Sequence, residues 1–401
     1  MGENFSDAST REEFELRVRE AKSGNSRAID ELSDIYVRGN LNSPYRKEAI
    51  AALTELAKKG IPRAIFQIGL YHSTGGRADS KAKALRCFIM ADKLGDLDGT
   101  TNAGRCFYNG WGSEPDYERA VQYFRKGAEA GNPSCMESLA HCLYGGNGTK
   151  RDLAQAVEWT RKAAELGDAK AMNELGVFLI NGEGVERDPR AAFDWFVKSY
   201  EEGCSKGAMD VFACYSEGVG TEQDSRKALE WLMKAVEGDC AEATHILAEL
   251  YSNGSGVEQD ERKAVELYAK AANLGFPPSM CELGMQYSIG DILERDPARA
   301  LHWYRRAAQS GYNEAYAYLG VCSEEGDGVP QDFVKALACF NKAAEAGVGT
   351  AIFKMGLYYL EGRPGVPRDE DKGLACMKSL AEKGYQPAIE YLKKKKRGFF
   401  R

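Results

Sequence analysis

The chain has 401 residues, of which 43% are hydrophobic and 28% charged, a composition typical of an ordered, soluble protein that is long for a single core. Its formal net charge of −7 includes +6 from the last nine residues, KKKKRGFFR, which leaves −13 for everything before them. So acidic a body disfavours nucleic acid as the main ligand, because nucleic-acid binding depends on cations that neutralise phosphates.

The sequence also indicates a cellular compartment. It has no apolar run of 18 residues, and its start has neither the basic nor the apolar region of a signal peptide. Eleven cysteines, an odd number without a CxxC pair, indicate free thiols in a reducing compartment. We therefore expect a cytoplasmic protein without stable membrane insertion.

In chain order, residues 1–11 are expected to be a flexible N-terminus. Residues 12–27 match the second helix of a helix pair through Leu16, Ala21 and Gly24, which predicts an N-terminal capping helix. Residues 28–387 carry an internal repeat with a period of 36 residues. The period is clearest in a recurring aspartate: Asp116, Asp152, Asp188, Asp224, Asp260, Asp296 and Asp332.

Ten repeats follow when each begins at a small residue: Ala28, Ala64, Gly99, Cys135, Ala171, Gly207, Ala243, Ser279, Ala315 and Ala351. Counting from that residue, an apolar side chain at +4 and a small one usually at +5 predict a first helix on which a neighbour packs closely. Glycines near +11 and +13 end it, and the aspartate at +17 caps a second helix. Basic residues at +20, the third helical position, oppose the helix dipole, and we expect a nearby acid to pair with them.

Residues 388–401 predict a C-terminal capping helix that runs into the basic tail. Ala388 and Leu392 begin the pattern of another first helix. The tail is suited to anionic lipid, an acidic partner or a nuclear import receptor, and it is equally compatible with a solvated helix end.

The repeat resembles the Sel-one-like repeat (SLR) family. Two copies carry the resemblance well, AMNELGVFLINGEGVERDPRAAFDWFVKSYEEG and SMCELGMQYSIGDILERDPARALHWYRRAAQSG. The resemblance implies an all-α fold, a right-handed superhelical α-solenoid of about ten antiparallel helix pairs with half-repeat caps, which acts as an adaptor or scaffold for other proteins. The first repeat departs from the pattern, with NLNSPYRKEA in place of its glycine loop.

Motifs that suggest chemistry have structural explanations. The Gly-x-Gly and aspartate of NGEGVERDP, residues 181–189, resemble a phosphate or metal loop, but their recurrence in most repeats favours a turn and a helix cap. The cysteines shared at +7 are expected to be buried: Cys106, Cys142, Cys214 and Cys322. The four histidines lie in different repeats without metal-ligand spacing, so we expect no metal and no cofactor.

Partner-binding residues are expected on the inner surface, by analogy with related helical-pair arrays, at −1, +2, +6 and +9 of the first helix. Aromatic, Arg and Met side chains are favoured at interface cores. The candidates are Phe66, Leu70, Arg105, Tyr108, His141, Tyr144, Val177, Ile180, Met209, His245, Met285, Phe353 and Leu357. Trp111 is added because it interrupts a glycine loop where no other repeat has an aromatic residue. It either contacts a partner or folds back on its own repeat.

The leading hypothesis is a non-enzymatic scaffold, monomeric or weakly associated, that binds a protein or peptide along its inner groove. One alternative is a hydrolase acting on β-lactam or cell-wall peptide, because Ser80 and Lys83 form a Ser-x-x-Lys and such an activity is attached to some cysteine-rich relatives. Another is a membrane-surface adaptor that uses the basic tail.

Overall fold

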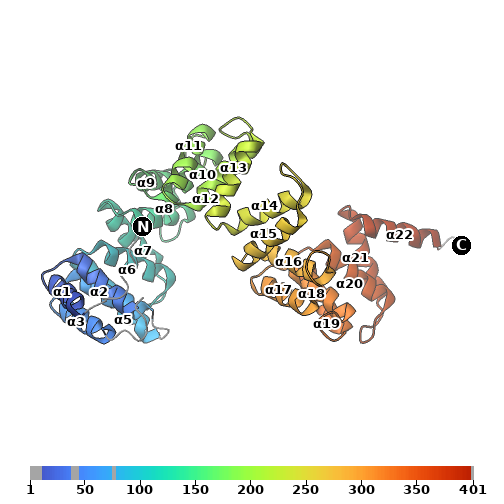
Figure 1. Cartoon of the computed structure of the whole chain (residues 1–401), viewed down its shortest axis with the longest axis horizontal. Helices are drawn as coiled ribbons and strands as arrows, with labels where there is room; N and C mark the ends of the chain where they lie inside the picture. Colours follow the sequence, from blue (N-terminus) through green and yellow to red (C-terminus); the bar gives the residue numbers. More distant parts are fainter. Residues whose placement is uncertain (1–10, 38–44, 75–77, 399–401) are drawn as a thin grey trace. The chain divides into compact units, whose positions relative to one another are not determined.

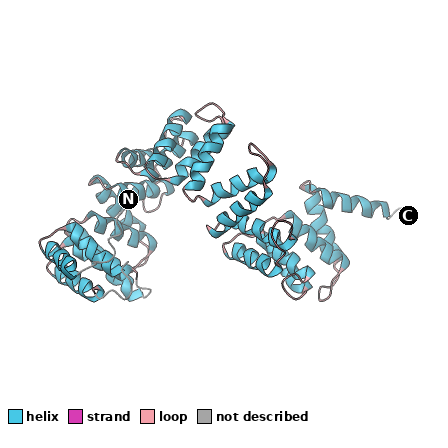
Figure 2. Ribbon diagram, viewed as in Figure 1, coloured by secondary structure: helices cyan, strands magenta, loops and turns pink. Residues whose placement is uncertain are grey.

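Helices make up the part of the chain that the computed structural model describes, residues 11–37, 45–74 and 78–398 (Figures 1 and 2). These residues form 22 helices and no strand. Three predicted features fall partly or wholly outside them: residues 1–10 of the N-terminus, residues 40–44 of the first repeat's loop, and residues 399–401 of the tail.

The helices form ten consecutive pairs. The first helices are α2 Ser26–Val37, α4 Pro62–Ser73, α6 Leu97–Asn109, α8 Pro133–Gly145, α10 Ala169–Asn181, α12 Ser205–Glu217, α14 Ala241–Asn253, α16 Pro277–Ile289, α18 Ala315–Glu325 and α20 Gly349–Glu361. The second helices are α3 Arg46–Lys58, α5 Ala78–Lys93, α7 Tyr117–Glu129, α9 Leu153–Glu165, α11 Pro189–Glu201, α13 Ser225–Glu237, α15 Glu261–Asn273, α17 Pro297–Gln309, α19 Phe333–Glu345 and α21 Glu370–Glu382.

One single helix flanks the pairs at each end. Helix α1, Arg11–Lys22, packs on α2, and α22, Gln386–Gly398, packs on α21. Consecutive helices contact one another from α1 to α11 and from α13 to α22. The predicted all-α solenoid with half-repeat caps is confirmed.

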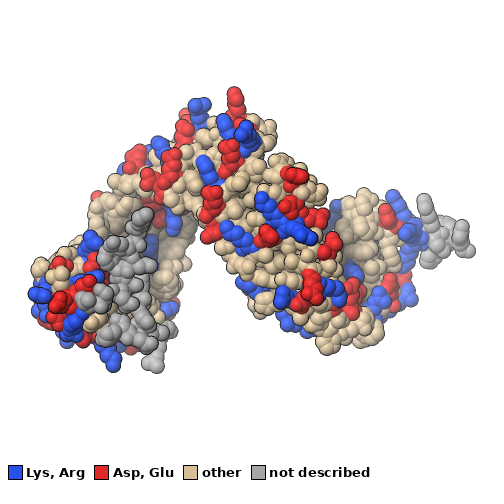
Figure 3. All heavy atoms as spheres, viewed as in Figure 1, with Lys and Arg blue, Asp and Glu red and all other residues tan. Residues whose placement is uncertain are grey.

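Two compact bodies make up the chain. The N-terminal body comprises residues 1–207 and 219–221, with helices α1 to α11, and the C-terminal body comprises residues 208–218 and 222–401, with most of α12 and helices α13 to α22. On the face shown in Figure 3, acidic and basic side chains are interspersed on both bodies. Charge on that face therefore acts locally, over the reach of single side chains.

The small residue at +5 accepts an aromatic ring from the second helix of its own pair. A Cβ atom at Gly104 would lie 2.5 Å from the Phe124 ring, and one at Gly320 would lie 2.5 Å from the Phe340 ring. Both rings are buried. Close packing of this kind explains why the position is so often glycine, since overpacking a core is costly.

The stretch NGEGVERDP is a helix stop followed by a helix start. Gly182 takes a left-handed conformation, with φ of 72°, and ends α10. The Arg187 Nε then donates to the carbonyl oxygen of Ile180 at 2.9 Å, which satisfies an unpaired group at the helix end. The Asp188 carboxylate accepts from the backbone N–H of Ala191 at 3.0 Å and caps α11. The predicted capping role is confirmed.

Three of the basic residues at +20, Arg119, Lys227 and Arg299, pair with an acid, and in each case the acid is the cap itself. Arg299 Nε lies 3.2 Å from a carboxylate oxygen of Asp296, and its guanidinium lies 5.5 Å from the Tyr287 ring centroid. Arg119 repeats the arrangement, 4.0 Å over the Phe107 ring. Each cation thus joins the cap of the second helix to an aromatic residue at +8 of the first, a role that offsets its unfavourable position on the helix dipole.

The four tryptophans at +24 each contact a cation of their own helix. They are half-buried, and in each case a cation three residues later lies between 3.7 and 4.7 Å from the ring centroid. The residues are Trp159 with Lys162, Trp195 with Lys198, Trp231 with Lys234, and Trp303 with Arg306. Their surfaces are therefore largely used within the fold.

Candidate functional site

Two adjoining hollows lie in the N-terminal body along the first helices of three successive pairs, α6, α8 and α10. The first has a volume of about 200 Å³ and the second about 260 Å³. His141 and Glu174 line both, so the two hollows form one continuous groove. We call it the α6–α10 groove.

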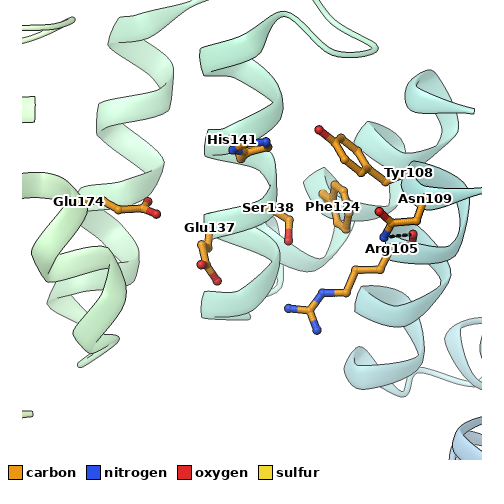
Figure 4. Close-up of a pocket in the computed structure, with 8 residues that line it drawn as sticks. All are labelled: Arg105, Tyr108, Asn109, Phe124, Glu137, Ser138, His141 and Glu174. Atoms are coloured by element: carbon orange, nitrogen blue, oxygen red, sulfur yellow. Dashed lines mark hydrogen bonds between the residues drawn. The ribbon is translucent and has the colours of Figure 1, made fainter. Parts of the chain in front are cut away.

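The first hollow is built between α6 and α8 (Figure 4). The Arg105 side chain extends from α6, and the Tyr108 ring points toward His141 of α8, with 6.1 Å between the ring centroids. The Tyr108 hydroxyl accepts from Nδ2 of Asn147 at 3.0 Å. Asn147 belongs to the loop of the following repeat, so two repeats together hold this ring.

Charges in the first hollow are not neutralised by the fold. Arg105 is exposed and makes no ion pair with any residue in the described part of the chain. Glu174 is exposed at the rim of the hollow, and partial desolvation, together with the charge of Glu137, raises the pKa of its carboxyl, while Lys206 lowers it. The two carboxylates therefore stand where a cation from outside would relieve their repulsion.

The second hollow, between α8 and α10, is more apolar. The Tyr144 and Phe178 rings lie 5.8 Å apart, beside Val177, which exposes 37% of its surface. The Tyr144 hydroxyl donates to Glu183 at 2.9 Å, and the Arg151 guanidinium lies 5.7 Å from the centroid of its ring. These contacts fix an exposed aromatic surface in place, which lowers the entropy that a partner must remove on binding.

The groove brings together five of the candidates from the sequence: Arg105, Tyr108, His141, Tyr144 and Val177. Ile180 and Leu70 are half-buried and line neither hollow. Phe66 exposes only 5% of its surface and packs against Phe88, so the expectation that its ring faces a partner is wrong. Gly69 has no side chain, so the Phe88 ring can lie against its backbone and beside Phe66 in the interior.

The remaining candidates lie in the C-terminal body, apart from Trp111. Phe353 and Leu357 pack against a buried cluster that includes Leu380, and Phe353 also contacts the Tyr385 ring. Met209 and Met285 are half-buried. His245 lines a separate hollow.

Trp111 exposes 48% of its surface in the loop after α6. Its backbone N–H donates to the carbonyl of Cys106 at 2.8 Å, so the loop is anchored although the ring is half outside. Trp111 lines neither hollow of the α6–α10 groove. Its role in partner binding stays a prediction.

The sequence selection missed several groove residues, among them the charged residues Glu137, Glu174 and Lys206. Glu137 and Lys206 occupy offsets +2 and −1, which belong to the expected inner set, but the selection retained mainly aromatic and aliphatic side chains. Glu174 occupies offset +3, outside that set. The sequence did contain a signal for Glu137 and Lys206, because both are charged residues at offsets of the expected inner surface.

The alternative sites have ordinary surroundings. The exposed side chains of Lys83 and Asp79 form an ion pair on α5, with 2.9 Å between Nζ and the carboxylate, so the amine of the Ser-x-x-Lys already has a partner. The four cysteines at +7 are buried as predicted, and burial raises the pKa of each thiol to about 11. Across the described ranges, no group of three or more His, Cys, Asp or Glu side chains is placed to hold a metal ion.

Two further observations concern the membrane alternative. None of the described helices is long and apolar enough to cross a bilayer. In the basic tail, Lys393 and Lys394 are exposed, whereas Lys395 forms an ion pair with Glu370 of α21. One of the tail's cations therefore serves to dock α22.

The model of the Sel1 repeat matches nine consecutive segments between residues 62 and 385. The chain belongs to the Sel1 repeat family. The nine segments correspond to the pairs from α4–α5 to α20–α21. The first predicted repeat, α2 with α3, is a helix pair that lies outside the matched segments.

Solved Sel1 repeat structures share this fold. A protective antigen with an SLR fold from uropathogenic Escherichia coli strains is 26% identical, with a TM-score of 0.55 over 95% of this chain and 90% of its own. A Sel1 repeat protein from Oxalobacter formigenes is 27% identical, with a TM-score of 0.58 over 75% of this chain and 88% of its own.

A similar protein by sequence is DAP3-binding cell death enhancer 1 of Rattus norvegicus, 30% identical over 101 residues. The match spans 25% of this chain and 20% of that relative's length. Sel1 repeats, like other stacked helix pairs, generally serve as protein-interaction scaffolds, because each repeat contributes a short stretch of a long binding surface.

Proposed function

We propose that this Sel1 repeat chain is a non-enzymatic adaptor that binds an extended segment of a partner protein in the α6–α10 groove. The partner segment carries an acidic side chain, a basic side chain and an aromatic or aliphatic side chain in that order along the groove. The adaptor acts as a monomer or weak oligomer in the reducing cytoplasm, where its buried thiols stay protonated, and it needs no cofactor.

The continuity of the two hollows carries this proposal. Elsewhere in the repeat, charged and aromatic side chains are used by the fold, as Arg119 and Asp116 are. In the groove, Arg105 remains exposed without an ion pair to any described residue. Residues that differ from repeat to repeat and are not used in packing are those available for recognition.

From α6 to α10 the groove presents groups of three kinds that complement different side chains of a partner. Arg105 suits an acidic side chain, Glu137 with Glu174 suits a basic one, and the Tyr144, Phe178 and Val177 surface suits an apolar one. Adjacent helices stand about 10 Å apart and an extended peptide rises about 3.3 Å per residue, so each repeat contacts about three residues. A partner segment of roughly six to nine residues spans the three first helices.

Site-specific photo-crosslinking tests the proposal. A benzophenone amino acid is placed at Val177 in the groove or, as a control, at Gln122, which is exposed on second helix α7. We expect one partner to crosslink from Val177 and not from Gln122. The double variant Arg105→Glu, Tyr108→Ala should lose that partner while its circular dichroism shows that the helices are retained. Retained crosslinking in the double variant would place the binding site elsewhere.

A further inference from the structure

The C-terminal body contains a separate hollow of about 520 Å³ along its own first helices, α14, α16, α18 and α20. Three glutamates line it, Glu249 from α14, Glu282 from α16 and Glu314 immediately before α18. It is larger than either hollow of the α6–α10 groove, and it shares no residue with them. We call it the acidic hollow.

Cations of the fold do not balance these carboxylates. Lys354 is the basic residue of the lining, and its Nζ is paired with Glu324 at 2.8 Å. His245 approaches Glu249 at 3.5 Å, but burial lowers its pKa, so the ring is neutral at pH 7. Glu282 and Glu314 make no ion pair within the described ranges, and desolvation together with Glu249 raises the pKa of Glu282.

The walls of the acidic hollow are aromatic and aliphatic. Tyr318 is held by stacking on Tyr304, with centroids 4.9 Å apart and planes 7° from parallel. Burial raises the pKa of Tyr312 to about 12, so its phenol is neutral, and the lining continues with Val321 and Val348. A rigid ring face beside uncompensated carboxylates attracts a cation on an apolar stem.

We propose that the acidic hollow binds an arginine side chain from an extended segment of a partner protein. The guanidinium fits better than an ammonium, because its planar face stacks on tyrosine and its N–H groups donate to carboxylates in pairs. The adaptor then holds partner protein at two places of different selectivity, the α6–α10 groove and an arginine site that is independent of it.

Peptide arrays test this inference. Nine-residue peptides with a central arginine are compared with matched sets in which citrulline or lysine replaces it. Citrulline keeps the shape of arginine and removes the charge, so we expect the arginine set to retain the protein at least tenfold better than the citrulline set and better than the lysine set. The double variant Glu249→Gln, Glu282→Gln should lose this preference, whereas Glu345→Gln, exposed on α19, should keep it.

Other outcomes would overturn the inference. These are equal retention of the arginine and citrulline sets, equal retention of the lysine set, no retention of any arginine peptide, or an unchanged preference in the double variant. Free L-arginine that binds as tightly as the best peptide would also contradict a peptide site. The variant Arg105→Glu, Tyr108→Ala should leave the arginine preference intact, so failure of the groove and failure of the acidic hollow are separately visible.

Discussion

Asn147 donates a hydrogen bond of 3.0 Å to the hydroxyl of Tyr108 across the joint between two repeats. Tyr108 lies in the last turn of the first helix of one repeat, and Asn147 lies in the loop that follows the first helix of the next. The groove is therefore not merely an open face of stacked helices. A loop residue fixes the orientation of an aromatic side chain toward His141, which is how a scaffold prepares a surface for binding.

Removing that support should weaken binding more than folding. Asn147→Ala removes the hydrogen bond that orients the Tyr108 ring. If the lost free energy of about 1 kcal/mol is needed to hold the binding orientation, it corresponds to about a fivefold loss of affinity for the groove's partner. The dissociation constant for the partner found by crosslinking, measured by calorimetry, checks this. Asn273→Ala, exposed at the end of α15, is the control and should bind as the wild type does. Unchanged affinity for Asn147→Ala would show that Tyr108 is not a contact residue.

The repeat could be predicted from sequence because its determinants are local. Gly182 and Asp188 each satisfy the backbone groups at a helix end, and such groups follow the same rules in every helix. The cation at +20 was harder to predict. Pairing with a nearby acid was expected, but stacking on the ring at +8 depends on how the two helices meet. Recurrence of the aromatic residue at +8 was the available signal.

The groove was predicted only in part, because offsets give the direction of a side chain and not its neighbours. Phe66 and Val177 were chosen by the same reasoning, yet Phe66 is covered by Phe88 while Val177 is exposed. Glu174 and Glu282 each have a pKa raised in part by a glutamate of the preceding repeat, Glu137 and Glu249, and no single repeat reveals such a neighbour. Charged residues that recur on neighbouring first helices are therefore as useful for predicting a binding surface as the hydrophobic period is for predicting the fold.

The second glycine of the loop has a role between repeats that a matched pair of variants should expose. Gly184 and Gly256 both occupy +13 with positive φ, 72° and 77°. A Cβ at Gly184 would collide with the backbone carbonyl of Leu153 in the preceding repeat, whereas a Cβ at Gly256 would meet nothing within 4 Å. Both alanine variants carry the cost of a left-handed conformation, on the order of 1 kcal/mol.

Gly184→Ala should therefore destabilise the chain by about 1 to 3 kcal/mol more than Gly256→Ala, the usual cost of overpacking. Urea unfolding followed by circular dichroism at 222 nm measures the difference. Equal losses would mean that the loop moves away from Leu153 at no cost, and that the close contact between repeats is not required.

The acidic hollow should be stabilised by removing a charge. The pKa of Glu282 is raised in the folded state. Its favourable contribution to the free energy of unfolding is therefore fully present below the pKa of the unfolded state, and it is lost as the pH rises through the pKa of the folded state. At pH 7.5 the ionised carboxylate costs stability, and Glu282→Gln should raise the free energy of unfolding. Near pH 3.5 the carboxyl of Glu282 is protonated and therefore neutral, as the glutamine is, so the variant should no longer be more stable than the wild type. Thermal unfolding at the two pH values, with Glu345→Gln as the control, decides this, and a gain at pH 3.5 as large as at pH 7.5 would contradict it.

A buried hydroxyl beneath the second hollow offers a last test. Thr160 of α9 exposes 1% of its surface, and its Oγ1 has no hydrogen-bond partner among the described residues. Thr160→Val keeps the shape and removes the unsatisfied group, which should stabilise the fold by about 1 kcal/mol. Ser199→Ala is the matched contrast, because the Ser199 hydroxyl donates to the Ala169 carbonyl at 2.7 Å and its removal should destabilise the fold by about 1 kcal/mol. In urea unfolding, the two variants should change the free energy of unfolding in opposite directions. A loss of stability in Thr160→Val would show that the hydroxyl has a hydrogen-bond partner in solution.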